Sequence, residues 1–161
     1  MKHILLCMFF SISLFSGCAY KPEALPMKPA MLGDYFQVDG KITLSNVATT
    51  DRLKTWTDSL IKMLSDELVK RGATISEDSD NILYVEIYDT YQNPLYFYWA
   101  NKCILRVNIK TSKEHSRQFE VVDVSGLSCQ RACGFCMTKA VAEILNDRQT
   151  LKDIGATVKP L

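Results

Sequence analysis

The side chains most capable of chemical reactions are those of four cysteines in the second half of the chain. Cys129, Cys133 and Cys136 stand within the stretch Cys-Gln-Arg-Ala-Cys-Gly-Phe-Cys, and Cys103 precedes them in an alternating apolar segment. Thiols can form disulfides, exchange them with other proteins or bind a soft metal ion. Each use is a hypothesis for this cluster, and buried thiols without a chemical role are a further one.

Disulfide formation is the use that accounts for all four thiols. An even number of cysteines favours complete pairing in an oxidising compartment, and four cysteines allow three connectivities. We predict one bridge within the cluster and one from it to Cys103. Cys133 and Cys136 are the favoured partners because they share the apolar face of a predicted helix. Each bridge would stabilise the fold by about 2–4 kcal/mol.

Redox exchange and metal binding are the alternatives. Cys133-Gly134-Phe135-Cys136 is a CxxC motif at the predicted start of a helix, where the helix dipole can lower the pKa of a thiol. Thioredoxin-like proteins place this motif after a strand early in the domain, whereas here it opens the last predicted helix. Three or four thiolates could bind zinc, but no second CxxC completes the usual pattern. We therefore predict no metal site.

Motifs of other catalytic classes do not occur. The patterns HExxH, GxSxG, GxGxxG and the phosphate-binding loop are missing from the sequence. The chain contains two histidines, His3 and His115. His3 lies in a segment that export would remove, and His115 is predicted to lie in a charged, solvated turn. We therefore expect no catalytic residue and no enzyme.

The N-terminal segment predicts export and lipid anchoring. A basic start precedes the apolar residues 4–15 and the small pair Ser16-Gly17. Such a run is too short for a permanent membrane span and is typical of a signal peptide. The sequence from Phe15 to Cys18 resembles a bacterial lipobox, in which the signal is cut before an acylated cysteine. We expect a lipoprotein signal peptide over residues 1–17 and lipid, such as palmitate, on Cys18.

The rest of the chain is close to neutral. Residues 1–17 contain one lysine and no acid, so the remaining 144 residues have 18 Lys and Arg against 18 Asp and Glu. This balance, with no basic stripe, argues against nucleic-acid binding. Three prolines and Gly33 interrupt residues 18–34, which we interpret as the lipidated cysteine and a flexible tether. Residues 35–161 are then predicted to form a single α+β domain.

Apolar periodicity predicts six elements in the order β-α-β-β-β-α. Alternation with a period of two indicates strands, and spacings of three and four indicate helices. The predicted strands cover 35–44, 82–91, 97–111 and 117–125, and the predicted helices cover 50–71 and 130–147. These elements fit a two-layer sandwich, in which a mostly antiparallel four-stranded sheet is covered by two helices. Cys103 then faces the helix layer.

Aromatic residues gather around the predicted Asn93-Pro94 turn. Alternation places Tyr96 and Tyr98 on the outer side of their strand, and Tyr91 lies across the turn from them. Tyrosines suit surfaces that are half apolar and half wet. These three residues are therefore candidates for a surface that contacts a partner protein or the membrane, with ordinary decoration of a hairpin as the alternative.

Several segments resemble the YajG-type family of Gram-negative outer-membrane lipoproteins. The similarity covers about residues 53–155 and rests on the helix pattern at 60–72, the strand at 82–91, Ser125-Gly126 and the pattern KAVAEILND at 139–147. The lipopolysaccharide-assembly lipoprotein LptE has a similar element order. The resemblance implies an α+β lipoprotein without established enzymatic activity. By similarity to Gram-negative lipoproteins, Ala19 after the acylated cysteine favours the outer membrane.

These observations predict a non-catalytic outer-membrane lipoprotein that faces the periplasm. We expect it to act as a binding or assembly subunit of a cell-envelope complex, held to the membrane by its lipid and in contact with an envelope protein. No cofactor is expected apart from the covalent lipid. The alternative is a periplasmic thiol–disulfide redox protein that uses Cys133 and Cys136.

We predict that the native protein starts at Cys18 and that this residue carries acyl chains. Each buried methylene contributes about 0.8 kcal/mol, so several chains would hold the protein on a membrane. Mass spectrometry of the N-terminal peptide from native membranes measures the modification, and Cys18→Ser should release the protein from the membrane fraction. A soluble, unacylated wild-type chain as the main species would contradict the prediction.

Overall fold

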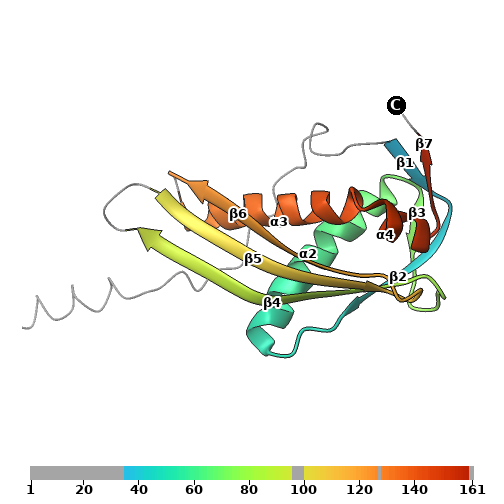
Figure 1. The fold of residues 1–161 in the computed structure, drawn as a ribbon, viewed down its shortest axis with the longest axis horizontal. Coiled ribbons are helices and arrows are strands. Elements are labelled where there is room, and N and C mark those ends of the chain that lie inside the picture. Colours follow the sequence, from blue (N-terminus) through green and yellow to red (C-terminus); the bar gives the residue numbers. More distant parts are fainter. Residues whose placement is uncertain (1–34, 96–99, 127, 160–161) are drawn as a thin grey trace, which may run out of the picture.

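A five-stranded sheet is the centre of the computed structural model, which describes residues 35–95, 100–126 and 128–159 (Figure 1). The sheet has the strand order β3-β2-β4-β5-β6. Its strands are β2 (Gly40–Asn46), β3 (Ala73–Ile75), β4 (Ile82–Leu95), β5 (Ala100–Thr111) and β6 (Ser116–Ser125). The helices are α2 (Asp51–Val69), α3 (Cys129–Leu145) and the short α4 (Arg148–Asp153), and a separate two-stranded sheet joins β1 (Tyr35–Val38) to β7 (Ala156–Lys159).

The sheet is mixed. β4, β5 and β6 follow one another as an antiparallel meander, whereas β2 pairs in parallel with both β3 and β4. Parallel neighbours need a crossover connection, and α2 supplies it between β2 and the strands that follow. Within the described residues, no helix has the length and apolar character needed to cross a membrane.

The α2 helix is specified by its cap and its apolar stripe. The Thr50 side chain accepts a hydrogen bond from the backbone N–H of Leu53 and so begins the helix. Residues at three- and four-residue spacing then face the sheet and are buried: Trp56, Leu60, Met63, Leu64 and Leu68. After the helix, Gly72 adopts a φ of +96°, and an added Cβ there would lie 3.0 Å from the backbone oxygen of Val38. This turn therefore requires glycine.

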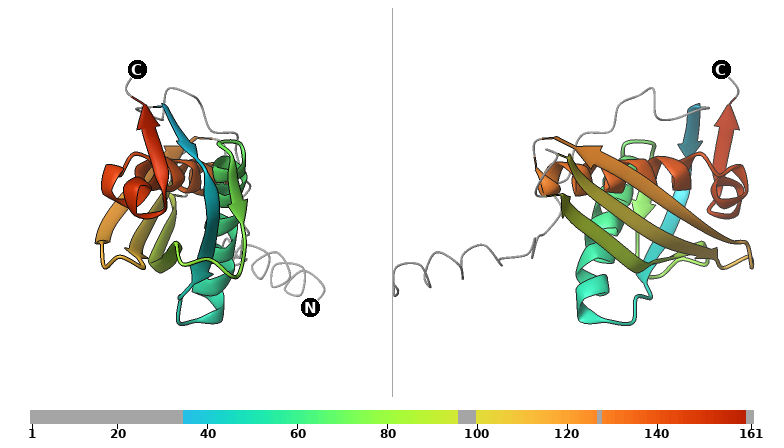
Figure 2. Two further views of the ribbon diagram at one scale, coloured as in Figure 1. Left: turned by 90° about the vertical axis from the view of Figure 1, so that its right-hand side faces the viewer. Right: turned by 60° about the vertical axis from the view of Figure 1, so that its left-hand side comes forward.

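The α3 helix lies on the same face of the sheet as α2. It begins at a Ser128 cap, whose hydroxyl accepts from the Arg131 N–H at 3.1 Å. Its residues are buried around most of its circumference, since it packs on β5 and β6 and also contacts α2. Both helices lie behind the long strands in Figure 1, and the two views of Figure 2 show that they occupy one side of the sheet.

A one-residue bulge in β4 changes which side chains face the core. Ile87 pairs with Val107, but the next pair along the strands is Asp89 with Arg106, so Tyr88 is the extra residue. Before the bulge, the odd-numbered residues of β4 face the helices. After it, the even-numbered ones do, and Gln92 lies opposite the buried Cys103. The bulge therefore places Tyr91 on the outer face.

The α+β class and the cover of two main helices on one sheet layer are confirmed. The sheet nevertheless has five strands where four were predicted, because β3 has three residues and is too short to show alternation. The predicted strand 35–44 is two strands, which are separated at Asp39, just before Gly40 with its φ of +149°. β1 leaves the central sheet to pair with β7. The short elements α4 and β7 were not predicted.

Leu64→Ala is predicted to lower the free energy of unfolding by about 2–5 kcal/mol, because the side chain is fully buried between α2 and the sheet. Urea denaturation measures the change. Val69→Ala is the matched control on the same helix, since Val69 is 53% exposed and its truncation should change the free energy by less than about 0.5 kcal/mol. An equally small effect at Leu64 would show that this packing is wrong.

Candidate functional site

The four cysteines meet at one place beneath the first two turns of α3. Cys103 lies on the helix-facing side of β5, and Cys129, Cys133 and Cys136 lie on α3. All four are buried, with exposed fractions between 0 and 8%. The predicted proximity of Cys103 to the cluster is therefore confirmed. We call these four residues the thiol cluster.

The thiols form a chain of contacts. The Cys103 side chain is hydrogen-bonded to those of Cys133 and Cys136, and Cys133 is in turn hydrogen-bonded to Cys129. The Cys136 Sγ also donates to the backbone oxygen of Cys103 at 3.1 Å. Gln92, the cross-strand neighbour of Cys103, lies at the other end, with its Oε1 4.0 Å from the Cys129 Sγ. The order of contacts is thus Cys136, Cys103, Cys133 and Cys129.

This arrangement separates the acidities of two neighbouring thiols. Hydrogen bonds with Cys133 and Cys136, together with burial, raise the pKa of Cys103 far above its usual range. The hydrogen bond from Cys103 lowers the pKa of Cys133, and Cys129 and Gln92 act in the same direction against the effect of burial. Cys133 is therefore the thiol that ionises most readily of this pair, and Cys103 is its proton donor.

The four cysteines are free of disulfide bonds in this structure. No disulfide joins any two of Cys103, Cys129, Cys133 and Cys136, so the predicted bridges are absent from it. Over the described ranges, no three His, Cys, Asp or Glu side chains are arranged to hold a metal ion. The hydrogen bonds of the thiols go to one another and to the backbone.

Access to the sulfur atoms is restricted. Cys133 and Cys136, the pair of the CxxC motif, are 1% and 0% exposed. A redox enzyme presents its attacking thiol to the disulfide of a substrate, which needs a partly exposed sulfur. Here α3 would have to move before a protein substrate could reach either sulfur.

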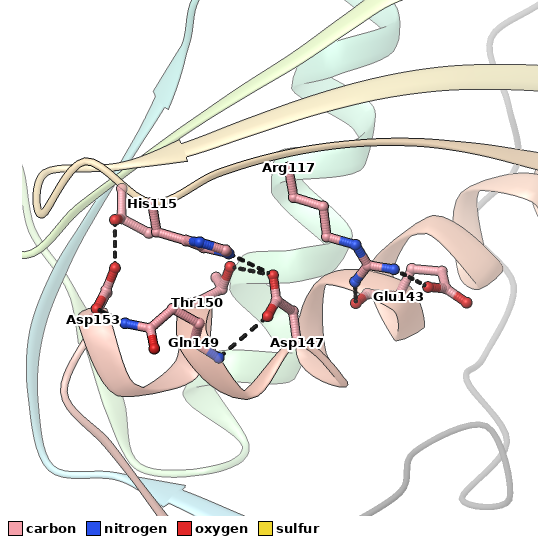
Figure 3. Close-up of polar contacts among 8 residues, drawn as sticks. His115, Arg117, Glu143, Asp147, Gln149, Thr150 and Asp153 are labelled. Atoms are coloured by element: carbon pink, nitrogen blue, oxygen red, sulfur yellow. Dashed lines mark hydrogen bonds and ion pairs between the residues drawn. The ribbon is translucent and has the colours of Figure 1, made fainter.

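A second polar cluster ties the β5–β6 hairpin to α4 (Figure 3). His115 is half-buried, and its Nε2 lies 2.8 Å from Oδ2 of Asp147. His115 lies in the predicted turn between β5 and β6, but the prediction that its side chain is solvated was wrong, because the hairpin folds back onto Asp147, the residue that caps α4. Thr150 donates to the same carboxylate oxygen at 2.9 Å, and the backbone N–H of Gln149 donates to the other at 3.2 Å.

The contacts of this second cluster hold the hairpin to α4 and do not form a nucleophile–base pair. A nucleophile requires its hydroxyl to donate to the base that activates it. Here the Thr150 hydroxyl and the imidazole both lie against the Asp147 carboxylate, so the hydroxyl is already committed elsewhere. A neighbouring pair repeats the pattern, because the buried Thr111 donates to the buried Asp153 at 2.7 Å. Figure 3 shows these contacts beside the Arg117–Glu143 ion pair.

The outer face of the sheet carries an apolar group near the Leu95 end of β4. Tyr91, Ile104 and Val122 are direct cross-strand neighbours, and Val124 lies one step further along β6. Tyr91, Val122 and Val124 are 51, 36 and 52% exposed. We call these four residues the open-face patch. Of the three predicted surface tyrosines, Tyr91 is on it, whereas Tyr96 and Tyr98 lie outside the described residues.

The valines of this patch were missed by the sequence analysis, although a signal existed. Val121 and Val122 are consecutive, so one of them must face away from the core if the segment is a strand. Val121 is buried and Val122 is exposed. By the same alternation, Ile104 follows the inward-facing Cys103 in β5 and therefore faces outward.

The edge of β6 beside the patch is closed by side chains. Lys139 of α3 donates to the backbone oxygen of Val122 at 3.1 Å and pairs with Asp123 at 2.8 Å. Asp123 in turn accepts from the backbone N–H of Val124 at 2.7 Å. Such capping occupies backbone groups that could otherwise pair with a strand of another chain.

Comparisons with known proteins give a fold likeness at low similarity. No family model matches the chain, and no curated protein matches it, so the YajG-type resemblance stays a prediction. A protein from Xanthomonas campestris of the family DUF330 aligns at 16% identity and a TM-score of 0.44, over 84% of this chain and 91% of that chain. A Helicobacter pylori protein described as a neuraminyllactose-binding hemagglutinin homolog aligns at 10% identity and a TM-score of 0.36, over 81% and 96%.

Asp147→Asn is predicted to make the free energy of unfolding less dependent on pH in the acidic range. Burial alone would raise the pKa of Asp147, but hydrogen bonds from His115 and Thr150 outweigh it and lower the pKa. A lowered folded-state pKa stabilises the fold above the usual pKa of aspartate, and this contribution is lost as the pH falls toward the folded-state value. Asparagine keeps the helix cap and removes the charge. The variant should be about 1–2 kcal/mol less stable at pH 7.

Urea titrations at pH 7 and at steps between about pH 5 and pH 3 measure this effect. The difference in free energy of unfolding between wild type and Asp147→Asn should shrink as the pH falls. Asp66→Asn, at an exposed site on α2, is the control and should follow the wild type. A difference at Asp147 that stays constant down to pH 3 would refute the assignment.

Proposed function

We propose that this protein is a non-catalytic, lipid-anchored subunit of a cell-envelope complex that binds a partner protein through the open-face patch. The observation that carries the proposal is the exposure of Tyr91, Val122 and Val124 side by side on the uncovered face of the sheet. Scattered apolar residues are normal on a protein surface, but a contiguous group with an aromatic residue is typical of an interaction site.

The two halves of the outer face differ sharply in character. Next to the patch, Arg106 lies between Asp89 at 2.6 Å and Glu120 at 2.8 Å, so charged residues there neutralise one another. Further along, Asn108 donates to Glu86 at 3.4 Å. A partner that buried this polar half would have to break these pairs. The apolar half requires no such loss, and this favours a contact at the Leu95 end of β4.

The charge beside the patch favours a protein partner with an acidic group. Lys102 is the cross-strand neighbour of Val124 and, among the described residues, forms no ion pair. A carboxylate at the rim of the partner would complement it, and rim charges of this kind guide association and fix orientation. Because the β6 edge is capped by Lys139 and Asp123, we infer contact with the face and no extension of the sheet.

Anchoring and location belong to the same proposal. The lipobox ending at Cys18 supports attachment to the outer membrane, with the folded part in the periplasm. A tether over residues 18–34 could span at most about 55 Å when fully extended. The folded part would then begin, at Tyr35, within this distance of the membrane surface.

Thiol–disulfide exchange is the second candidate function. It is favoured by the lowered pKa of Cys133 and by the buried side chain of Gln92, a donor that contributes to this lowering. A Cys133 thiolate would give this donor a charged acceptor. Against it stands the burial of both CxxC sulfurs. Cys133→Ser combined with Cys136→Ser would abolish the function of a redox protein, whereas a binding subunit that still folds would keep it.

We predict that a photoreactive side chain at position 122 or 124 captures one and the same envelope protein in intact cells. The same side chain at position 69 is the control, because Val69 is as exposed as Val124 but lies at the end of α2. Val124→Lys should then weaken the binding of the purified partner by about tenfold or more, since it places a charge in an apolar contact. Val69→Lys should leave the affinity unchanged.

Three results would overturn the proposal. Capture of the same protein from position 69 would show a contact that does not depend on the patch. Crosslinks to a second copy of this chain would mean self-association, and crosslinks to lipid alone would mean that the patch rests on the membrane. In the last two cases the open-face patch would have another occupant.

A further inference from the structure

The thiol cluster restricts which cysteines can join when the protein is oxidised. Four cysteines allow three complete pairings, and each can be compared with the observed contacts. The sulfur contacts run in the order Cys136, Cys103, Cys133 and Cys129. In only one of the three pairings is every cysteine joined to a neighbour in this order. That pairing joins the first cysteine to the second and the third to the fourth.

The pairing of Cys103 with Cys133 fails on helix geometry. It would leave Cys129 to join Cys136, seven residues further along the same helix. A rise of 1.5 Å per residue separates their Cα atoms by about 10 Å. Disulfides need Cα atoms within about 6.8 Å, so this bridge would require α3 to unwind.

The pairing of Cys103 with Cys129 fails on position. Cys103 contacts Cys133 and Cys136, which belong to the second turn of α3, whereas Cys129 is the first residue of the helix. The Cys129 sulfur is directed toward Gln92, on the strand next to Cys103. This bridge would exchange two existing sulfur contacts of Cys103 for a new one a helical turn away.

We propose that oxidation joins Cys103 to Cys136 and Cys129 to Cys133. The first bridge joins Cys103 to the cysteine whose Sγ already lies 3.1 Å from the backbone oxygen of Cys103. The second spans four residues of α3, for which the helical rise gives a Cα separation of about 6 Å, within the range for disulfides. The first bridge fastens α3 to β5, and the second stays within one turn.

The chemistry is ordinary thiol–disulfide exchange. A thiolate of the cluster attacks a disulfide of the oxidant, the oxidant's S–S bond breaks, and one of its sulfurs leaves as a thiol. The partner cysteine then attacks the mixed disulfide, so that each bridge transfers two electrons and two protons to the oxidant, which becomes two thiols. The oxidant is a protein disulfide of the compartment outside the cytoplasm, and oxidised glutathione serves in its place in a refolding experiment.

The burial of the sulfurs determines at which stage of folding this reaction occurs. The four sulfurs are at most 8% exposed once α3 is in place, so the exchange occurs while α3 docks on the sheet. The inference rests on the export that is part of the proposed function, because a reducing compartment would keep the thiols reduced. The refolding experiment tests the pairing independently of location.

Peptide mapping of the unreduced protein decides between the pairings. The protein is taken from native membranes, denatured, alkylated and digested with trypsin and chymotrypsin. Cleavage after Lys102, Arg106, Arg131, Phe135 and Lys139 places the four cysteines on four different peptides. We expect the 103–106 peptide linked to the 136–139 peptide, and the peptide ending at Arg131 linked to the 132–135 peptide.

Two variants test the independence of the bridges. Cys129→Ser should leave the Cys103–Cys136 link in place and Cys133 alkylated. Cys136→Ser should leave the Cys129–Cys133 link in place and Cys103 alkylated. The wild-type map needs neither variant to fold, so it decides the pairing alone if one of them aggregates.

Other maps would overturn the inference. Four alkylated cysteines after refolding with oxidised glutathione, or a link from the 103–106 peptide to either of the other two, would each contradict it. The N-terminal peptide of the same native digest reports acylation at Cys18. A chain without lipid there would refute the anchoring, while the refolded sample would still give the pairing.

Discussion

The single extra residue in β4 controls what lies on either side of the sheet. Up to Ile87, the strand presents Leu83 and Val85 to the helices, as simple alternation requires. The bulge at Tyr88 reverses the alternation for the rest of the strand. Without it, Tyr91 would enter the core beside the thiol cluster, and Gln92 would face outward. One register step therefore produces both the polar side chain beside Cys129 and the exposed aromatic ring of the open-face patch.

The same end of the molecule thus combines two opposite environments. Beneath the sheet, the sulfurs of Cys103, Cys133 and Cys136 are enclosed by α3 and satisfy one another. Above it, the patch is uncovered while the adjoining β6 edge is closed by Lys139 and Asp123. A rigid base under an exposed surface reduces the entropy lost when a partner binds, because the strands are already ordered.

The two long helices, and the inward-facing side chains of β5, were predictable because their signals are long and periodic. The α2 stripe and its Thr50 cap span nineteen residues, and the core side of β5 is set by uninterrupted alternation around Cys103. Cys103 could therefore be placed against the last helix from sequence alone. The exposed valines of β6 gave a weaker signal, which becomes clear only once the strand is known to have one uncovered face.

The remaining features depend on contacts between distant segments. β3 and β7, with three and four residues, are too short for periodicity and form because a neighbouring strand offers hydrogen bonds. The bulge in β4 carries no marker such as glycine, so alternation continues through it in the sequence. The position of His115 depends on Asp147, thirty-two residues away, and no local pattern connects the two.

The small β1–β7 sheet also determines how the molecule would respond to mechanical load. Tyr35 is the first described residue and pairs with Lys159, so the chain enters the fold through a ladder of four residue pairs. Val38, the last residue of this ladder, also donates a backbone hydrogen bond to Arg71 and is fully buried. A pull from the N-terminal side would load these hydrogen bonds and the buried side chains of Phe36 and Val38 first, and the five-stranded sheet only after them. Once released, β1 would lengthen the tether, and the five-stranded sheet would stay folded while β1 gave way.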